Sequence, residues 1–129
     1  MKREPAFLTL AEVVEIHADQ IRQYGGGEGI RDITLLSAAV AMPYVSFSER
    51  FLHADIFEMA AAYAFHLSQN HPFIDGNKRT ALVSALVFLE MNGLSISDPE
   101  SLLYDAMLAL AAGKLGKSDF AGILRKLKG

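Results

Sequence analysis

The sequence predicts an all-α domain, a bundle of about six helices with two buried helices at its centre. Two consecutive stretches, residues 54–69 and 77–91, are apolar on nearly every helical face, which is typical of buried helices. No stretch alternates polar and apolar residues for long enough to indicate a strand. Because 51% of the 129 residues are hydrophobic, a real core is possible, and we expect residues 1–129 to fold as one domain.

Local signals mark where the helices begin and end. Thr9 and Glu12 form a capping box at the start of the first helix, and the glycines at 25–27 end it. Caps of Asp or Ser at helix starts, and Pro or Asn-Gly at helix ends, place the others. The predicted ranges are about 33–42, 54–69, 77–91, 99–112 and 118–127. Residues 44–51 lose the helical periodicity, so we predict a loop there.

The composition excludes several classes of function. Without cysteine, the chain has no disulfide, iron–sulfur cluster, thiolate zinc site or cysteine nucleophile. With a net charge of −3, the chain lacks the excess of positive charge that non-specific nucleic-acid binding needs, so we expect no direct binding of nucleic acid. Lys2 and Arg3 are followed by no apolar segment, and no apolar stretch is long enough to span a bilayer. We therefore expect a cytoplasmic protein that has no membrane partner.

The link between the two buried helices carries more polar chemistry than a short connection needs. It reads His71-Pro72-Phe73-Ile74-Asp75-Gly76-Asn77-Lys78-Arg79 and leads into the second buried helix. The first turn of a helix exposes unpaired amides and carries partial positive charge. Gly76 has no side chain, so an anion can approach the backbone there. The sequence therefore predicts an anion-binding turn.

The polar residues around this turn point to phosphate chemistry. Lys78 and Arg79 are unfavourable at a helix start, and a bound phosphate would compensate for them, with Asn77 adding further donors. Asp75 precedes the amides, so it is better placed to hold a Mg²⁺ that bridges phosphate oxygens than to contact phosphate itself. His71 lies just outside, where a neutral imidazole could take the proton of an attacking hydroxyl.

A purely structural interpretation accounts for each of these residues taken singly. Asp75 can be an N-cap, Gly76 a turn residue, and Lys78 with Arg79 a solvated face. The concentration of such residues within nine adjacent positions, 71–79, favours a functional site over that interpretation.

At these residues the sequence resembles the Fic superfamily and, within it, the death-on-curing (Doc) toxins. The family signature reads His-x-Phe-x-Asp/Asn-Gly/Ala-Asn-Lys-Arg, and residues 71–79 match every position. The likeness covers roughly residues 9–115, through segments 29–36, 63–73 and 80–93. It implies the Fic fold, a helical bundle in which the active-site loop joins the two central buried helices.

The resemblance also implies a role for each motif residue. His71 would be the general base for a target hydroxyl, Asp75 would bind Mg²⁺, and Phe73 would anchor the loop in the core. The rest would bind phosphate, with the Asn77 side chain on a phosphate oxygen: Gly76, Asn77, Lys78 and Arg79. ATP and Mg²⁺ are thus the expected nucleotide and metal ion.

Two departures from the wider Fic pattern indicate the reaction. Fic adenylyltransferases carry Gly where this chain has Lys78 and a second Arg where it has Leu82, and Doc toxins share both departures. The resemblance implies a protein kinase that binds ATP reversed and transfers its γ-phosphoryl group to a Ser/Thr hydroxyl of a translation factor, with elongation factor Tu suspected. Gly76, where the founding Doc toxin has Ala, is the Fic-like choice, and protein adenylylation stays the alternative.

The resemblance extends to regulation and to the target. Arg31 and Asp32, with the loop to Arg50, resemble the flap that positions the target chain. Self-inhibited Fic proteins carry Ser/Thr-x-x-x-Glu, which this sequence lacks, so a separate antitoxin is the expected partner. A catalytically silent binding module of the same fold is a further alternative, although it would not need to keep His71 and Asp75.

The other histidines are interpreted as structural. His66 stands five residues before His71, and such positions are not neighbours on a helix, so we expect a buried, hydrogen-bonded side chain. His17 and His53 have no partner in the sequence and are assigned to the core or the surface. A hydrolytic metal site on His71 and Asp75 would lack a third ligand.

Overall fold

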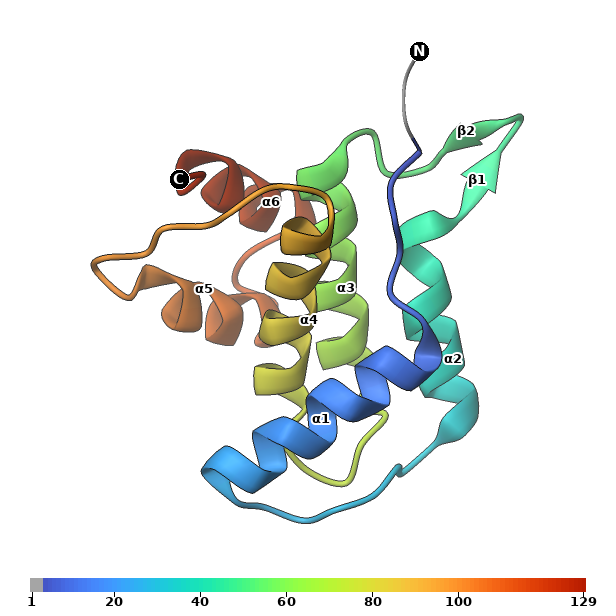
Figure 1. Cartoon of the computed structure of the whole chain (residues 1–129), viewed down its shortest axis with the longest axis vertical. Helices are drawn as coiled ribbons and strands as arrows, with labels where there is room; N and C mark the ends of the chain where they lie inside the picture. The colour runs from blue at the N-terminus through green and yellow to red at the C-terminus, as the bar shows by residue number, and fades with distance from the viewer. Residues whose placement is uncertain (1–3) are drawn as a thin grey trace.

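The computed structural model describes residues 4–129, so Lys2 and Arg3 lie outside the described part of the chain. Its helices are α1 (Leu10–Tyr24), α2 (Ile33–Ala41), η1 (Met42–Tyr44), α3 (Ile56–Asn70), α4 (Asn77–Met91), α5 (Leu102–Ala111) and α6 (Lys117–Lys126). The strands are β1 (Ser46–Phe47) and β2 (Arg50–Phe51). The predicted all-α bundle of six helices is confirmed (Figure 1).

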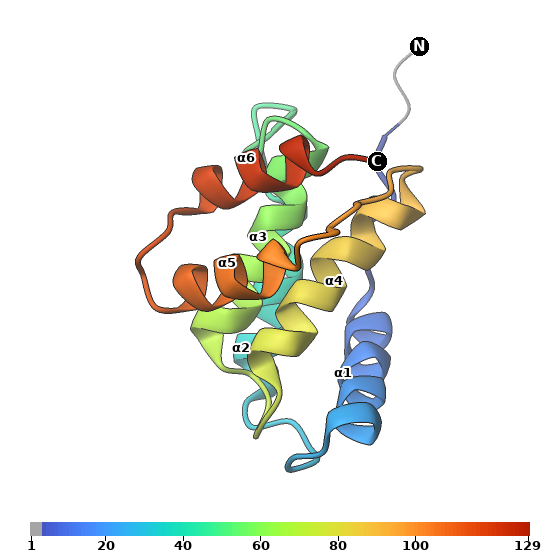
Figure 2. The same ribbon diagram turned by 90° about the vertical axis from the view of Figure 1, so that its left-hand side faces the viewer.

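Helices α3 and α4 form the centre of the bundle, as predicted. They lie side by side, with α1 and α2 on one flank and α5 and α6 on the other (Figures 1 and 2). Small residues fill the contacts of α3, where the four alanines 60, 61, 62 and 64 are fully buried. Large side chains from both helices complete the core, and they include Tyr63 and Phe88, whose rings lie 5.1 Å apart. Burying this surface is the main source of stability.

Helix α1 begins at the predicted capping box. The Thr9 hydroxyl accepts a hydrogen bond from the Glu12 amide at 3.1 Å, and the Glu12 carboxylate accepts one from the Thr9 amide at 2.8 Å. Just before the box, the Leu8 amide donates to the buried Tyr63 hydroxyl at 2.8 Å. These contacts fix the direction of α1, so that its C-terminal end lies beside the connection between α3 and α4 (Figure 1).

Residues 44–51, predicted to be a loop, contain a minimal hairpin. Ser46 pairs with Phe51 and Phe47 with Arg50 in antiparallel register. Ser48 and Glu49 form the two-residue turn with φ of 51° and 66°, the left-handed values that such turns require. No local pattern indicated this hairpin, because the Asn-Gly or Asp-Gly pair that is usual in such turns is absent.

The last two helices begin at positions other than those predicted. Helix α5 starts at Leu102 and not after Pro99, because Ser101 adopts a left-handed conformation (φ 55°) that interrupts a helix. Asp98 still caps it, accepting hydrogen bonds from the amides of Leu102 and Leu103 at 2.8 and 2.9 Å. Helix α6 starts one residue earlier than expected, at Lys117.

A cluster of three nitrogen-bearing side chains joins α3 to α6. The Lys117 ammonium donates to Nε2 of His53 and to Nε2 of His66, each at 3.1 Å. His66 is thus hydrogen-bonded, as predicted, although it is half-buried, and His53 belongs to the core. Burial, together with the nearby ammonium, lowers the pKa of His66 to about 4 and also lowers the pKa of His53. Both rings therefore act as neutral acceptors near neutral pH.

The part of the chain from residue 4 to residue 129 contains no helix with the length and apolar character needed to cross a lipid bilayer.

This cluster predicts acid-sensitive stability. Because the pKa of His66 is lower in the folded chain than its ordinary 6.5, its contribution to stability is complete above pH 6.5 and is lost as the pH falls towards 4. We expect the free energy of unfolding in urea to fall between pH 7 and pH 5 by about 1 kcal/mol, a value reduced for the half-exposed side chain. His66→Gln, which keeps an acceptor, should flatten this dependence, whereas the exposed His71→Gln should not. Equal slopes in all three proteins would contradict the assignment.

Candidate active site

The motif loop, residues 71–76, packs against the segment that connects α1 to α2. The amides of Arg31 and Asp32 donate to the Pro72 carbonyl at 2.7 and 3.1 Å, and the Ile74 amide donates to the Gly29 carbonyl at 3.1 Å. Ile30 and Phe73 thereby form an antiparallel bridge. Two connections far apart in the sequence thus support each other at one end of the molecule (Figures 1 and 2).

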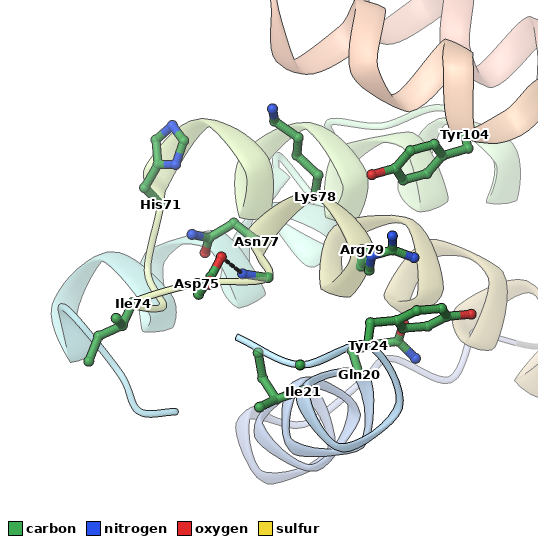
Figure 3. A pocket seen from close by; sticks show the side chains of 12 residues that line it. Gln20, Ile21, Tyr24, His71, Ile74, Asp75, Asn77, Lys78, Arg79 and Tyr104 are labelled. Atoms are coloured by element: carbon green, nitrogen blue, oxygen red, sulfur yellow. Dashed lines mark hydrogen bonds between the residues drawn. The ribbon is translucent and has the colours of Figure 1, made fainter. Parts of the chain in front are cut away.

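The backbone of His71 is held in a left-handed conformation directly after α3. Its φ of 46° and ψ of 54° are uncommon for a residue other than glycine. The Arg31 side chain fixes it: Nε donates to the His71 carbonyl at 2.6 Å and Nη2 to the Asn70 carbonyl at 3.0 Å. A guanidinium at the C-terminal end of a helix also interacts favourably with the helix dipole. The imidazole itself projects freely from the loop (Figure 3).

Asn77 braces the loop from inside. Its carboxamide accepts a hydrogen bond from the Phe73 amide and donates one to the Phe73 carbonyl, both at 3.0 Å. Both ends of the side chain are therefore engaged by the protein, which leaves the expected contact of this side chain with phosphate without support. The Phe73 ring is fully buried, as expected of an anchor, and stacks on the His17 imidazole at 3.8 Å.

Asp75 lies between two backbone amides. One carboxylate oxygen accepts from the Gly76 amide at 2.9 Å and the other from the Gly27 amide at 3.2 Å, while its carbonyl meets Nε2 of His17 at 2.8 Å. A Cβ on Gly26 would lie 2.8 Å from the same carboxylate, so the glycine segment permits this close approach. The carboxylate is thus oriented at the edge of the cleft.

The start of α4 is open, as an anion site requires. Gly76 is its N-cap with φ of 75°, and no side chain caps the helix. Within residues 4–129, no hydrogen bond is made to the amides of Asn77, Lys78 and Arg79. The three residues that carry these amides all line the same cleft, and Lys78 and Arg79 bring cationic side chains to it. The interpretation of Asp75 as an ordinary N-cap therefore fails, because Gly76 is the N-cap and the Asp75 carboxylate accepts from no amide of α4.

These groups surround a cleft of about 400 Å³, a size that suits a small-molecule ligand. It is bounded by the C-terminal end of α1, the motif loop, the start of α4 and one side chain of α5 (Figure 3). His71 and Asp75 lie at one end. Arg79 lies at the other between two rings, with its guanidinium carbon 3.9 Å from the Tyr24 ring centre and 5.3 Å from that of Tyr104.

The donor set is compatible with Mg²⁺ at the His71 end. Asp75 is the one carboxylate among the described residues that line the cleft, and its oxygens contact only backbone amides, not a competing cation. Mg²⁺ is commonly held by one or two carboxylates, with phosphate oxygens and waters completing the octahedron. Asp75 would hold the ion in that arrangement.

The structure brings the predicted motif residues together but gives the predicted flap residues a structural role. Arg31 caps α3, and Asp32 caps α2 through a 3.0 Å hydrogen bond from the Leu35 amide. The hairpin that holds Arg50 lies at the opposite end of α3 from the motif loop (Figure 1).

Sequence reasoning missed one side of the cleft. Four residues of α1 at positions i, i+3, i+4 and i+7 face the motif: His17, Gln20, Ile21 and Tyr24. That spacing places the four residues on one face of a helix, so the sequence could have indicated that they share a surface. Tyr104 of α5 had no such signal, because its approach depends on how two distant helices pack.

Loss of the Asn77 brace should loosen the motif loop. Asn77→Asp retains the acceptor for the Phe73 amide but loses the donor to its carbonyl, and Asn77→Ala loses both. Since each bond to a buried group contributes about 1 kcal/mol, we expect a graded loss of unfolding free energy and faster hydrogen exchange at the Phe73 amide, largest for Ala. Unchanged exchange in both variants would contradict the bracing role.

The chain is similar to known proteins over the part that carries this site. The Fic/DOC family model matches residues 7–89, from before α1 to near the end of α4. The chain is 36% identical over 120 residues to "Protein kinase doc" of Escherichia phage P1, which covers 92% of each chain. It is 39% identical over 74 residues to "Toxin Doc" of Mycolicibacterium smegmatis, which covers 57% of each. The resemblance carried by residues 71–79 is thus confirmed, and the chain belongs to the Fic/DOC family.

Proposed function

We propose that the protein is a Doc-type toxin that transfers the γ-phosphoryl group of ATP to a Ser or Thr hydroxyl of a target protein. The observation that carries this proposal is the open start of α4, where three residues with unbonded amides, two of them the cations Lys78 and Arg79, line the cleft. Such a combination suits a polyphosphate. The names of two relatives, a protein kinase and a toxin, support the same class of reaction.

The residues divide the reaction between the two ends of the cleft. The target oxygen bonds to the γ-phosphorus, the bond from that phosphorus to the β–γ bridging oxygen breaks, and ADP leaves. His71 takes the proton of the target hydroxyl. The amides at the start of α4, with Lys78 and Arg79, stabilise the charge on the phosphate oxygens. Mg²⁺, held by Asp75, would supply further charge neutralisation at those oxygens.

Protein adenylylation is the second candidate, and Gly76 favours it. A Cβ at this position would lie 3.1 Å from Ile21 Cδ1, so glycine gives more room beside the backbone than alanine. The Lys78 side chain, which lines the same cleft, narrows the space for inner phosphates and favours the kinase. A silent module is the third candidate, and the free imidazole of His71 argues against it.

This chain exposes an apolar surface beside the site on which a target chain could dock. Ile30, Ile33 and Ile74 are exposed around Arg31 and Asp32, whose side chains bind their own chain. We propose that a target segment docks on these isoleucines with its hydroxyl facing His71, and that the target is a translation factor, elongation factor Tu first. We also propose a separate antitoxin as inhibitor, in the cytoplasm.

Intact-mass analysis tests the reaction directly. Elongation factor Tu incubated with the protein, ATP and Mg²⁺ should gain the mass of one phosphate. His71→Asn should abolish the gain while the fold is kept, because asparagine tolerates a left-handed backbone. A gain of one adenylyl group would establish the second candidate, and no gain would contradict this choice of target.

Arg31 should act on the rate by positioning His71. Arg31→Ala frees the His71 and Asn70 carbonyls, so we expect kcat to fall about tenfold with little change in the KM for ATP. Arg31→Lys should not rescue it, since one ammonium lacks the planar fork that spans both carbonyls. The surface variant Arg22→Ala is the matched control. An unchanged kcat in Arg31→Ala would contradict the positioning role, because it would show that the left-handed backbone of His71 is maintained without the Arg31 side chain.

A further inference from the structure

The cleft extends beyond the phosphate-binding start of α4. Past Lys78 and Arg79 it reaches a region bounded by Tyr24 and Gln20 of α1 and by Tyr104 of α5 (Figure 3). No part of the proposed transfer step uses this region. It lies at the end of the cleft opposite His71, so a ligand with phosphates at the start of α4 has a second place to bind.

Two aromatic rings are accessible in this region. Tyr104 is 39% exposed and Tyr24 58% exposed, and both line the cleft. The Arg79 guanidinium lies 3.9 Å from the Tyr24 ring centre, so one side of a stacking arrangement is already built. The same guanidinium lies 5.3 Å from the Tyr104 ring centre, so it covers the Tyr104 ring less closely than the Tyr24 ring. Exposed rings beside a planar cation are suited to a flat aromatic ligand.

Gln20 adds a polar group without a protein partner at the same place. The residue is only 7% exposed and lines the cleft, and within residues 4–129 its side chain makes no hydrogen bond. Its carboxamide atoms are not fully buried, so a donor and an acceptor are accessible to a ligand. A carboxamide matches the donor and acceptor on the edge of a purine.

We propose that Tyr104, Tyr24 and Gln20 bind the base of the nucleotide, beside the Arg79 guanidinium that contacts both rings. This inference rests on the proposed function and names the residues that would hold the base in the reversed orientation implied by the resemblance. With the base at the tyrosines, the triphosphate runs back along the start of α4, and its terminal phosphate is the one nearest His71. The reverse orientation would place the base near Ile74, where the described cleft residues include no tyrosine or phenylalanine. The base subsite therefore selects phosphoryl transfer over adenylyl transfer.

Calorimetric titration with ATP and with inorganic tripolyphosphate, both with Mg²⁺, separates the base from the phosphates. Removing the ring in Tyr104→Leu should weaken ATP binding about tenfold and leave tripolyphosphate binding unchanged. Tyr104→Phe should keep the affinity of the wild type for ATP. Tyr44→Leu removes a half-exposed tyrosine outside the cleft and serves as the control. Gln20→Met should reduce the preference for ATP over a pyrimidine triphosphate.

Each outcome has a defined meaning. Equal weakening of both ligands in Tyr104→Leu would assign Tyr104 a structural role and overturn the subsite. Wild-type protein that binds tripolyphosphate as tightly as ATP would also overturn the subsite, but would leave the phosphate site of the proposed function standing. Wild-type protein that binds neither ligand would overturn both.

Discussion

The turn between α3 and α4 depends on one pair of hydrogen bonds, which the Asn77 carboxamide makes with the backbone of Phe73. Two buried helices must reverse direction here within six residues, and the polar backbone of the turn needs partners inside the protein. Asn77 supplies them from the first position of α4, so the helix start and the loop form one unit. The stacking of Phe73 on His17 attaches that unit to α1. The brace thereby helps to place the loop residues relative to the start of α4.

The motif therefore divides into residues that build the site and residues that are free to act. Phe73 and Asn77 are committed to the fold, and Asp75 is oriented by the amides of Gly27 and Gly76. His71 and Lys78 keep side chains that face solvent or the cleft. Preorganisation of this kind lowers the reorganisation needed during a reaction, because the donors already point to where charge develops. It also explains why so polar a segment can join two apolar helices.

Sequence patterns predicted the elements whose signals are local. The capping box of α1, the bounds of α4 and the glycine turn without a side-chain cap before α4 all depend on residues close together in the chain, and all agree with the structure. The start of α5 was wrong because the left-handed Ser101 carries no sequence signal. The clamp of Arg31 on His71 joins residues 40 positions apart, and the approach of Tyr104 depends on how α4 and α5 pack. Contacts of that kind arise from tertiary packing, which no local pattern encodes.

The uncapped start of α4 links ligand occupancy to folding. The glycine N-cap leaves the first amides of α4 without a side-chain acceptor, at a cost of roughly a few tenths of a kcal/mol, and an anion bound to those amides would offset it. Any ligand that binds the native chain alone raises its stability in proportion to the logarithm of its concentration. On the proposed function, a protein without nucleotide would open more often than one that holds it, and proteases would cleave the empty protein faster. The lifetime of the chain would then depend on the supply of that ligand.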